Sequence, residues 1–115
     1  MRATFDAVRR IALSLDHVAE VSSYGTPGFK VGGTLFARFH QDGKSLVLRT
    51  TMEEREELIA SDPDVYFITD HYLNYPWVLV RVARIQAGAL RDLLRGAHRK
   101  AASEKKRPAP RRPDR

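Results

Sequence analysis

The chain has 115 residues, no cysteine and a formal net charge of +6. This length fits one domain, and the 43% hydrophobic content supplies apolar side chains for a packed core. The absence of cysteine excludes disulfides, thiolate metal sites and a cysteine nucleophile. No apolar run approaches the ~18 residues of a membrane span, and the N-terminal segment carries charges throughout, unlike a secretory signal. We therefore expect a soluble, cytoplasmic protein that does not associate with membranes.

The positive charge is concentrated at the C-terminus. Residues 98–115 contain eight of the 20 Lys and Arg residues but two of the 14 Asp and Glu residues. The first 97 residues carry twelve side chains of each sign and are neutral overall. The high isoelectric point therefore belongs to the C-terminal segment, and it gives no argument that the folded body binds an acidic partner.

The first half of the chain predicts one helix and an antiparallel meander. Apolar residues recur at helical spacing from the N-cap candidate Thr4 to about Leu15. Gly25-Thr26-Pro27-Gly28 interrupts the extended stretch that follows, and Gly32-Gly33 and Asp42-Gly43 are typical of hairpin turns. The extended segments cover residues 20–31, 34–39 and 45–50. Loops this short return a strand only in the antiparallel sense.

The second half alternates helices with strands. Thr51 and Glu54 match a capping box and begin a helix that ends before Asp62-Pro63. Two further strands are predicted over 65–68 and 77–85, joined by a loop over 69–76, and a last helix begins near residue 86. The resulting order, α-β-β-β-α-β-β-α with hairpin connections, indicates a two-layer α+β domain in which the helices cover one face of an antiparallel sheet.

The C-terminal segment has a different composition from the rest of the chain. It contains three prolines and strings of Lys and Arg, with almost no apolar side chains beyond Ser103. Such a composition cannot bury enough surface to fold. We assign residues 1–100 to the folded domain and residues 101–115 to a basic, proline-rich, disordered tail.

Two blocks of the sequence resemble the MmcQ/YjbR family of small bacterial proteins. The first is SYGTPGFKVGGTLFA at residues 23–37, and the second is HYLNYPWVLVR at residues 71–81. The acidic helix and the Asp-Pro break between them are also similar to that family, and the resemblance covers about residues 1–100. It implies a "double-wing" α+β fold like that of type III secretion chaperones, and a DNA-binding role. It carries over no catalytic residue.

Side-chain alternation predicts a basic sheet face on the side away from the helices. Cations and large aromatic residues share this parity: Lys30, Phe36, Arg38, Arg49, Trp77 and Arg81. Leu35 has the opposite parity and is expected in the core. The cations would hold phosphates, with Lys44 added from a turn, while the rings stack on bases or pack on sugars. The alternative is that the charges only keep an open sheet face soluble and discourage edge association.

The tail is the second candidate for contact with nucleic acid. Its cations include Lys105, Lys106, Arg107, Arg111 and Arg112. Interrupted by prolines, they would lie along a phosphate backbone without reading base sequence. The alternative is a solubilising terminus that binds any polyanion weakly.

Aromatic residues in two loops form a third group. Tyr24 follows the first extended segment, while His71, Tyr72 and Trp77 lie in and after the loop over 69–76. They would either line an aromatic pocket with a few polar groups or cap the core at two bends shaped by Gly and Pro. The sequence leaves both interpretations open.

Catalytic and metal-binding signals are weak. Asp70 and His71 are adjacent, but no nucleophile motif surrounds Ser22 or Ser23. The four histidines are scattered, and no HExxH motif is present. We expect a protein that is not an enzyme and that uses no metal or other cofactor.

The sequence thus favours a DNA-binding protein, weak and largely non-specific, that uses the basic sheet face and the tail. No helix-turn-helix is expected, because strands separate the helices. The alternative is a protein- or peptide-binding module with a secretion-chaperone-like fold. A small-molecule binder at the Tyr24 and Tyr72 loops is a third hypothesis. The sequence does not determine the oligomeric state.

Overall fold

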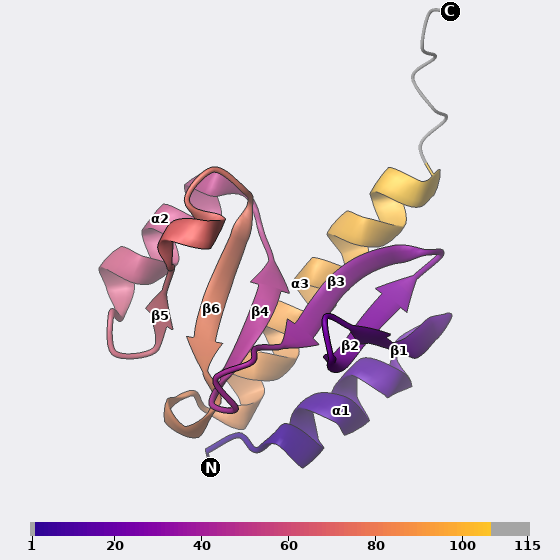
Figure 1. Ribbon diagram of the computed structural model, residues 1–115, viewed down its shortest axis with the longest axis horizontal. Coiled ribbons are helices and arrows are strands. Elements are labelled where there is room, and N and C mark those ends of the chain that lie inside the picture. The colour runs from indigo at the N-terminus through magenta and orange to yellow at the C-terminus, as the bar shows by residue number, and fades with distance from the viewer. Residues whose placement is uncertain (1, 107–115) are drawn as a thin grey trace, which may run out of the picture.

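The computed structural model describes residues 2–106 (Figure 1). Its α-helices are α1 Phe5–Ser14, α2 Met52–Ser61 and α3 Ala87–Lys106, and two short 3₁₀ helices are η1 Asp70–Tyr72 and η2 Val82–Arg84. Its strands are β1 Val18–Ser23, β2 Thr26–Val31, β3 Thr34–Phe39, β4 Ser45–Arg49, β5 Tyr66–Phe67 and β6 Trp77–Arg81. The tail cations Arg107, Arg111 and Arg112, and the side chains of Lys105 and Lys106, lie outside the described part.

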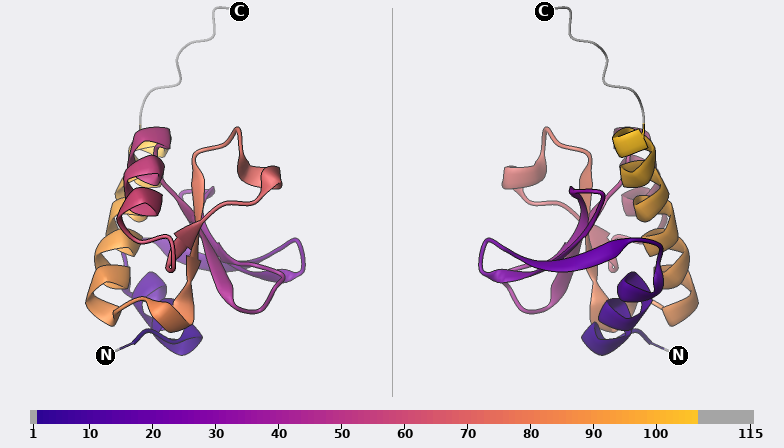
Figure 2. Two further views of the ribbon diagram at one scale, coloured as in Figure 1. Left: turned by 90° about the vertical axis from the view of Figure 1, so that its left-hand side faces the viewer. Right: turned by 90° about the vertical axis from the view of Figure 1, so that its right-hand side faces the viewer.

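The six strands form one antiparallel sheet in the order β1-β2-β3-β4-β6-β5. All three α-helices lie against the same face of this sheet, while η1 and its loop lie on the opposite face (Figure 2). The predicted α+β class, with an antiparallel sheet and helices on one face, is confirmed.

The main core lies between the sheet and the helix layer. Val8 of α1 and Leu90 and Leu94 of α3 are fully buried against strand residues such as Phe29 and Val80. Removing one such side chain from water contributes about 1.5–3 kcal/mol. A second, smaller cluster lies on the other face, where Tyr72, Val47 and Leu79 pack together with Phe67 and Trp77.

Both predicted helix caps form. The Thr4 hydroxyl accepts a hydrogen bond of 3.1 Å from the amide of Ala7, and the Thr51 hydroxyl accepts one of 3.0 Å from the amide of Glu54. The Glu54 carboxylate accepts a hydrogen bond from the backbone of Thr51, as the predicted capping box requires, and this bond helps to lower the pKa of Glu54. The same carboxylate accepts a 2.6 Å hydrogen bond from the Thr50 hydroxyl.

The first extended stretch forms two strands rather than one interrupted segment. Tyr24 and Gly25 both have positive φ, at 55° and 81°, which is the geometry that a two-residue type I′ hairpin requires. Thr26, Pro27 and Gly28, expected as a break, therefore belong to β2, which pairs with β1 along its whole length.

A β-bulge reverses the expected faces of two residues in β3. Phe29 pairs with Ala37 while Lys30 pairs with Leu35, so Phe36 is an extra residue without a partner in β2. A bulge of this kind shifts the alternation of side chains on one strand. Phe36, predicted to stack on nucleic acid, is instead fully buried on the helix side, and Leu35, predicted in the core, faces the other way.

The last helix is longer than predicted. Residues 101–106 continue α3, and Ala101 is fully buried in the main core. The predicted boundary between domain and tail at residue 100 is therefore wrong, because the helical, core-facing pattern of α3 continues past it. Among the described residues, no helix is long and apolar enough to cross a bilayer.

Candidate functional site

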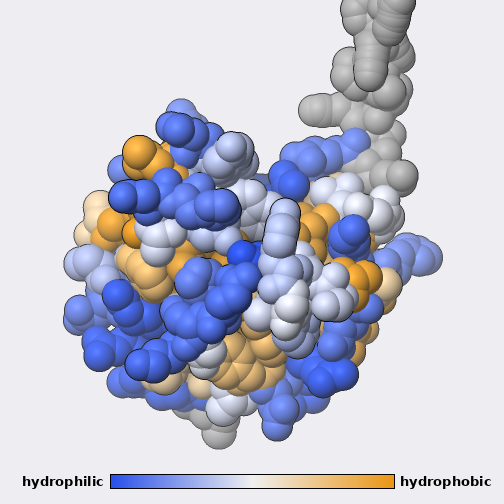
Figure 3. All heavy atoms as spheres, in the orientation of Figure 1, coloured by the Kyte–Doolittle hydropathy of each residue, from blue (hydrophilic) through white to orange (hydrophobic). Residues whose placement is uncertain are grey.

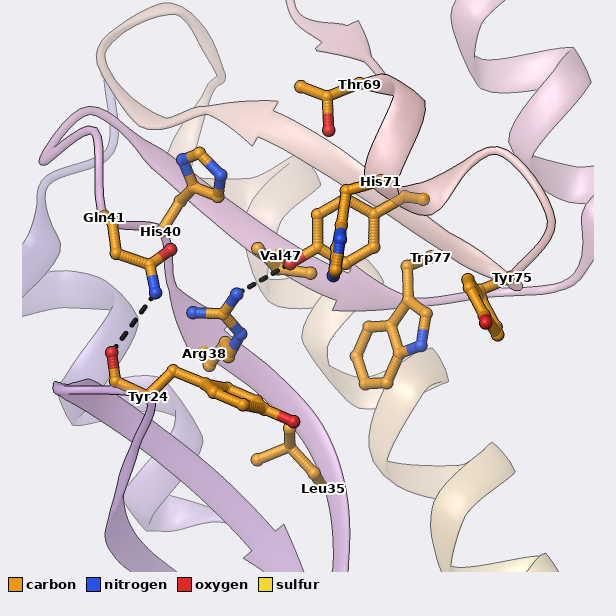
Figure 4. Close-up of a pocket in the computed structure, with 11 residues that line it drawn as sticks. Tyr24, Leu35, Arg38, His40, Gln41, Val47, Thr69, His71, Tyr75 and Trp77 are labelled. Carbon is orange, nitrogen blue, oxygen red and sulfur yellow. Dashed lines mark hydrogen bonds between the residues drawn. The ribbon is translucent and has the colours of Figure 1, made fainter.

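The sheet face away from the helices carries a cavity of about 580 Å³ (Figure 4). This volume is in the range of small-molecule sites. The lining comes from the β1–β2 turn, β3 and its following loop, β4, η1 and β6, and its main side chains are Tyr24, Arg38, His40, His71, Tyr72 and Trp77. The structure thus brings the predicted aromatic group together around a cavity. Tyr72 and Trp77 also cap the smaller core cluster, so both interpretations of this group hold in part.

Arg38 is the central polar residue of this cavity. Only 6% of the residue is exposed. Its Nη1 donates to the Thr26 hydroxyl at 3.3 Å and to the carbonyl of Phe39 at 3.2 Å, and its Nη2 donates to the Tyr72 hydroxyl at 2.6 Å. Its guanidinium lies 5.2 Å from the centre of the Tyr24 ring. The predicted phosphate-binding cation is therefore a buried group held by neutral partners.

A glycine on the neighbouring strand β2 provides space for the buried Arg38. Arg38 lies opposite Gly28 in the pairing of β2 with β3. A Cβ on Gly28 would lie 3.3 Å from the Cβ of Arg38 and 3.1 Å from Leu35. A glycine at this position removes that crowding beneath the cavity.

Arg49 and Arg81, the other two arginines of the predicted basic face, are also engaged within the protein. Arg49 pairs with Glu104 of α3 at 3.0 Å, and its guanidinium lies 5.1 Å from the Trp77 ring. Arg81 donates to the backbone carbonyls of residues 63 and 64 and lies 4.1 Å from the Phe67 ring. These arginines are therefore not an open set of phosphate ligands.

The surface of this face agrees with that correction. Hydrophobic residues (orange) show between hydrophilic ones (blue), so the face is not a continuous hydrophilic plane (Figure 3). Lys44 is exposed and Lys30 is half-buried, and neither has an ion pair within the described chain. Of the cations predicted for this face, these two lysines are the ones left uncompensated.

Arg55 is a positioning residue that the sequence analysis missed. It lies in α2, 2% exposed, and its guanidinium donates to the carbonyls of Tyr72, Leu73 and Tyr75 at 2.8–3.0 Å. These bonds fasten the η1 loop, which forms one wall of the cavity, to the helix layer. The available signal was a single arginine in an acidic helix, three residues before the half-buried Leu58 and so on the same side of α2.

The histidine at the rim of the cavity is tied to a neighbouring turn. The Nδ1 of His40 lies 3.3 Å from the Asp42 carboxylate and also accepts from the Asp42 amide at 3.2 Å. Partial burial raises the pKa of Asp42, but hydrogen bonds from Lys44 and Ser45 outweigh it and hold that pKa below its usual 3.8. Asp42 thus stays ionised, and its carboxylate accepts hydrogen bonds from Lys44 and Ser45 within the same turn. Within residues 2–106, no three His, Asp or Glu side chains are grouped as metal ligands.

A different set of cations lies on the helix layer. Arg10 of α1 and Arg91 and Arg95 of α3 line a shallow groove of about 200 Å³ between these two helices. All three are exposed, as is Arg99 one turn further along α3. None of the four makes an ion pair with a carboxylate in the part of the chain that the structure describes. The sequence analysis did not single out these residues.

Comparisons with known proteins agree with this fold. The model of the YjbR family matches residues 13–100. Over 37 residues the chain is 51% identical to uncharacterized proteins of Mycobacterium bovis and Mycobacterium tuberculosis, a stretch that spans 32% of this chain and 29% of each mycobacterial protein. The crystal structure of a Deinococcus radiodurans protein with a DUF419 domain is similar, with a TM-score of 0.77 and 28% identity over 93% of this chain and 83% of that one. Because the family match covers most of the sequence, the chain belongs to the YjbR family.

Proposed function

We propose that this protein binds DNA weakly and with little base specificity, through the exposed arginines of the helix layer and the cationic C-terminal segment. The observation that carries the proposal is the set of uncompensated arginines: Arg10, Arg91, Arg95 and Arg99. A cation that already pairs with a carboxylate has little to gain from a phosphate, whereas an unpaired exposed one releases the counterions of DNA on binding.

The spacing on α3 suits a run of phosphate contacts. Arg91, Arg95 and Arg99 are four residues apart, so they lie on one side of the helix, about 6 Å from one to the next along its axis. Arg10 extends this row across the groove to α1. The nearest acidic residue in sequence, Asp92, is exposed and forms no ion pair with them. The row therefore keeps its positive charge.

The C-terminal segment adds further positive charge to the chain. Residues 105–115 carry six Lys and Arg residues against Asp114, and they begin six positions after Arg99. Phosphate contacts of this kind position a protein on DNA but carry no base information. Lys30 and Lys44 lie on the other face of the sheet and contribute less to DNA binding. The proposal is a binding function rather than catalysis, and it includes the cytoplasmic location expected from the sequence.

The test compares two charge reversals of equal size on opposite faces. Binding of a fluorescent 20-base-pair duplex is measured by anisotropy at several salt concentrations for the full chain. The variant Arg91→Glu/Arg95→Glu should weaken binding and lower the salt slope by about 2, since each phosphate contact contributes about 0.9. The control Lys30→Glu/Lys44→Glu changes the net charge equally and should have a much smaller effect.

The contribution of the C-terminal segment is measured with a chain that ends at Lys106. This truncation removes the four arginines beyond Lys106. If they contact phosphate in the full chain, the salt slope of the shortened chain falls by about 3 to 4. Equal losses from both charge reversals would show that only net charge matters and would remove the helix-layer site. A full-length chain that does not bind duplex at low salt would overturn the DNA proposal altogether.

A further inference from the structure

We infer that the cavity around Arg38 binds a small aromatic carboxylate, with the carboxylate on Arg38 and the ring between Tyr24 and Trp77. This inference goes beyond DNA binding and does not rest on it. Residues of η1 line the cavity, whereas the arginine row belongs to α1 and α3, which lie on the opposite face of the sheet from η1 (Figure 2).

The first argument is a buried charge without a counter-charge. Arg38 is 6% exposed, and an arginine remains protonated at every physiological pH. Its hydrogen-bond partners are the Thr26 hydroxyl, the Phe39 carbonyl and the Tyr72 phenol. No carboxylate of the described chain lies within ion-pair distance of its guanidinium. Buried charges in proteins are normally paired, since desolvating an unpaired ion is costly. A bound anion would supply the missing charge.

The second argument is the number of donors left open. Nε and one of the two hydrogens on Nη2 have no acceptor among residues 2–106. A guanidinium fork with adjacent free N–H groups matches the two oxygens of a carboxylate. Since the Tyr72 hydroxyl accepts from Arg38, its own hydrogen is free to donate to the same anion.

The third argument is the shape of the walls. Tyr24 and Leu35 lie on one side of Arg38, and Trp77 and Tyr75 lie on the other (Figure 4). Tyr24 is 80% exposed, which leaves its ring free to contact a ligand. Its backbone has a left-handed φ of 55°, which is uncommon for a bulky residue. Its carbonyl accepts a hydrogen bond of 3.2 Å from Gln41, which helps to hold the turn beside the cavity. Flat rings on two sides suit a planar apolar body.

The fourth argument is that the cavity is already formed. Arg55 binds three carbonyls of the η1 loop, and Arg38 joins β3 to the same loop through Tyr72. A site held in this way loses little conformational entropy when a ligand binds. The alternative is that Arg38 serves only to tie the loop to the sheet.

Benzoate and its neutral analogue benzamide distinguish these two roles. Each is titrated at constant ionic strength into the full chain labelled with ¹⁵N, and amide shifts are followed by NMR. Benzoate should shift amides of Tyr24, Gln41 and Tyr72, and benzamide should bind about tenfold more weakly or worse, because it lacks the charge that Arg38 pairs with. Equal binding of the two probes, or no shift with millimolar benzoate, would overturn the inference.

Three variants complete the test. Arg38→Gln should abolish benzoate binding, and its folding is checked by its amide spectrum. Tyr24→Ala changes an exposed side chain, so it should stay folded and bind benzoate several-fold more weakly. Lys44→Gln removes a charge outside the cavity and should bind as the parent does. Unchanged binding by a folded Tyr24→Ala protein, or an equal loss in Lys44→Gln, would contradict the site.

Discussion

The Nη2 of Arg38 donates a 2.6 Å hydrogen bond to the hydroxyl of Tyr72, a residue 34 positions later in the chain. This bond joins the C-terminal end of β3 to η1, and with it the floor of the cavity to one wall. Its effect is structural, because it satisfies part of a buried guanidinium. Its removal is therefore the most direct test of how this face is held together.

Replacing Tyr72 with phenylalanine removes the acceptor and keeps the ring. We expect Tyr72→Phe to lower the free energy of unfolding by about 2 kcal/mol, since a hydrogen bond to a buried charge is worth about 1.5–3 kcal/mol. Urea denaturation measures the change. The control is Tyr75→Phe, whose exposed hydroxyl makes no hydrogen bond in the described chain and whose loss should cost less than about 0.5 kcal/mol. Equal effects of the two variants would contradict this account.

Arg55 should be more costly to lose. Arg55→Met keeps much of the aliphatic volume but leaves three loop carbonyls without their donor, so we expect about 3 kcal/mol of destabilisation. Amide hydrogen exchange over residues 69–76 should accelerate more than exchange in β4. Arg84→Met, at an exposed arginine without a side-chain hydrogen bond or ion pair in the described chain, is the control and should change neither quantity. Unchanged protection of the loop in Arg55→Met would show that other contacts hold it.

Glu54 predicts a pH dependence of stability. Partial burial raises its pKa, but hydrogen bonds from Thr50 and Lys100 outweigh it and lower the pKa from 4.5. As the pH falls, the Glu54 carboxylate is thus protonated in the unfolded chain before it is protonated in the folded chain. The contribution of Glu54 is therefore complete above about pH 4.5 and is lost as the pH falls through its folded pKa.

The variant Glu54→Gln removes that contribution. We expect it to be less stable than the parent at pH 7 and to lose less stability between about pH 5 and pH 3, as measured by urea denaturation at each pH. Glu57→Gln removes an exposed carboxylate that has no hydrogen bond or ion pair in the described chain, and serves as the matched control. A parallel loss of stability in parent and Glu54→Gln would refute the prediction.

The bulge in β3 predicts unequal costs at two neighbouring positions. Phe36→Ala should destabilise the fold by about 3–5 kcal/mol, because the ring is fully buried and packs 5.5 Å from the His98 ring of α3. Leu35→Ala, at a half-buried residue of the cavity, should cost clearly less. Thermal or urea denaturation of both variants gives the comparison. The reverse order would mean that β3 keeps a regular alternation.

Local interactions in the sequence were enough to predict most of the elements. The N-caps at Thr4 and Thr51, the turns at Gly32-Gly33 and Asp42-Gly43, and the apolar spacing of the helices all act within a few residues. They gave the antiparallel sheet with its helices on one face. The sequence also placed Tyr24, His71 and Tyr72 in two loops and Trp77 directly after the second loop, and these residues meet around the cavity.

The tertiary structure alone decided what the charged side chains do. Alternation placed Arg38, Arg49 and Arg81 on an open face, but their partners Tyr72, Glu104 and the carbonyls of residues 63 and 64 are distant in sequence. The bulge that exchanged Leu35 and Phe36 likewise depends on the register between two strands. The charge of a side chain and its place in the periodic pattern can be read from the neighbouring sequence. Whether that charge is neutralised depends on which distant groups folding brings within hydrogen-bond distance.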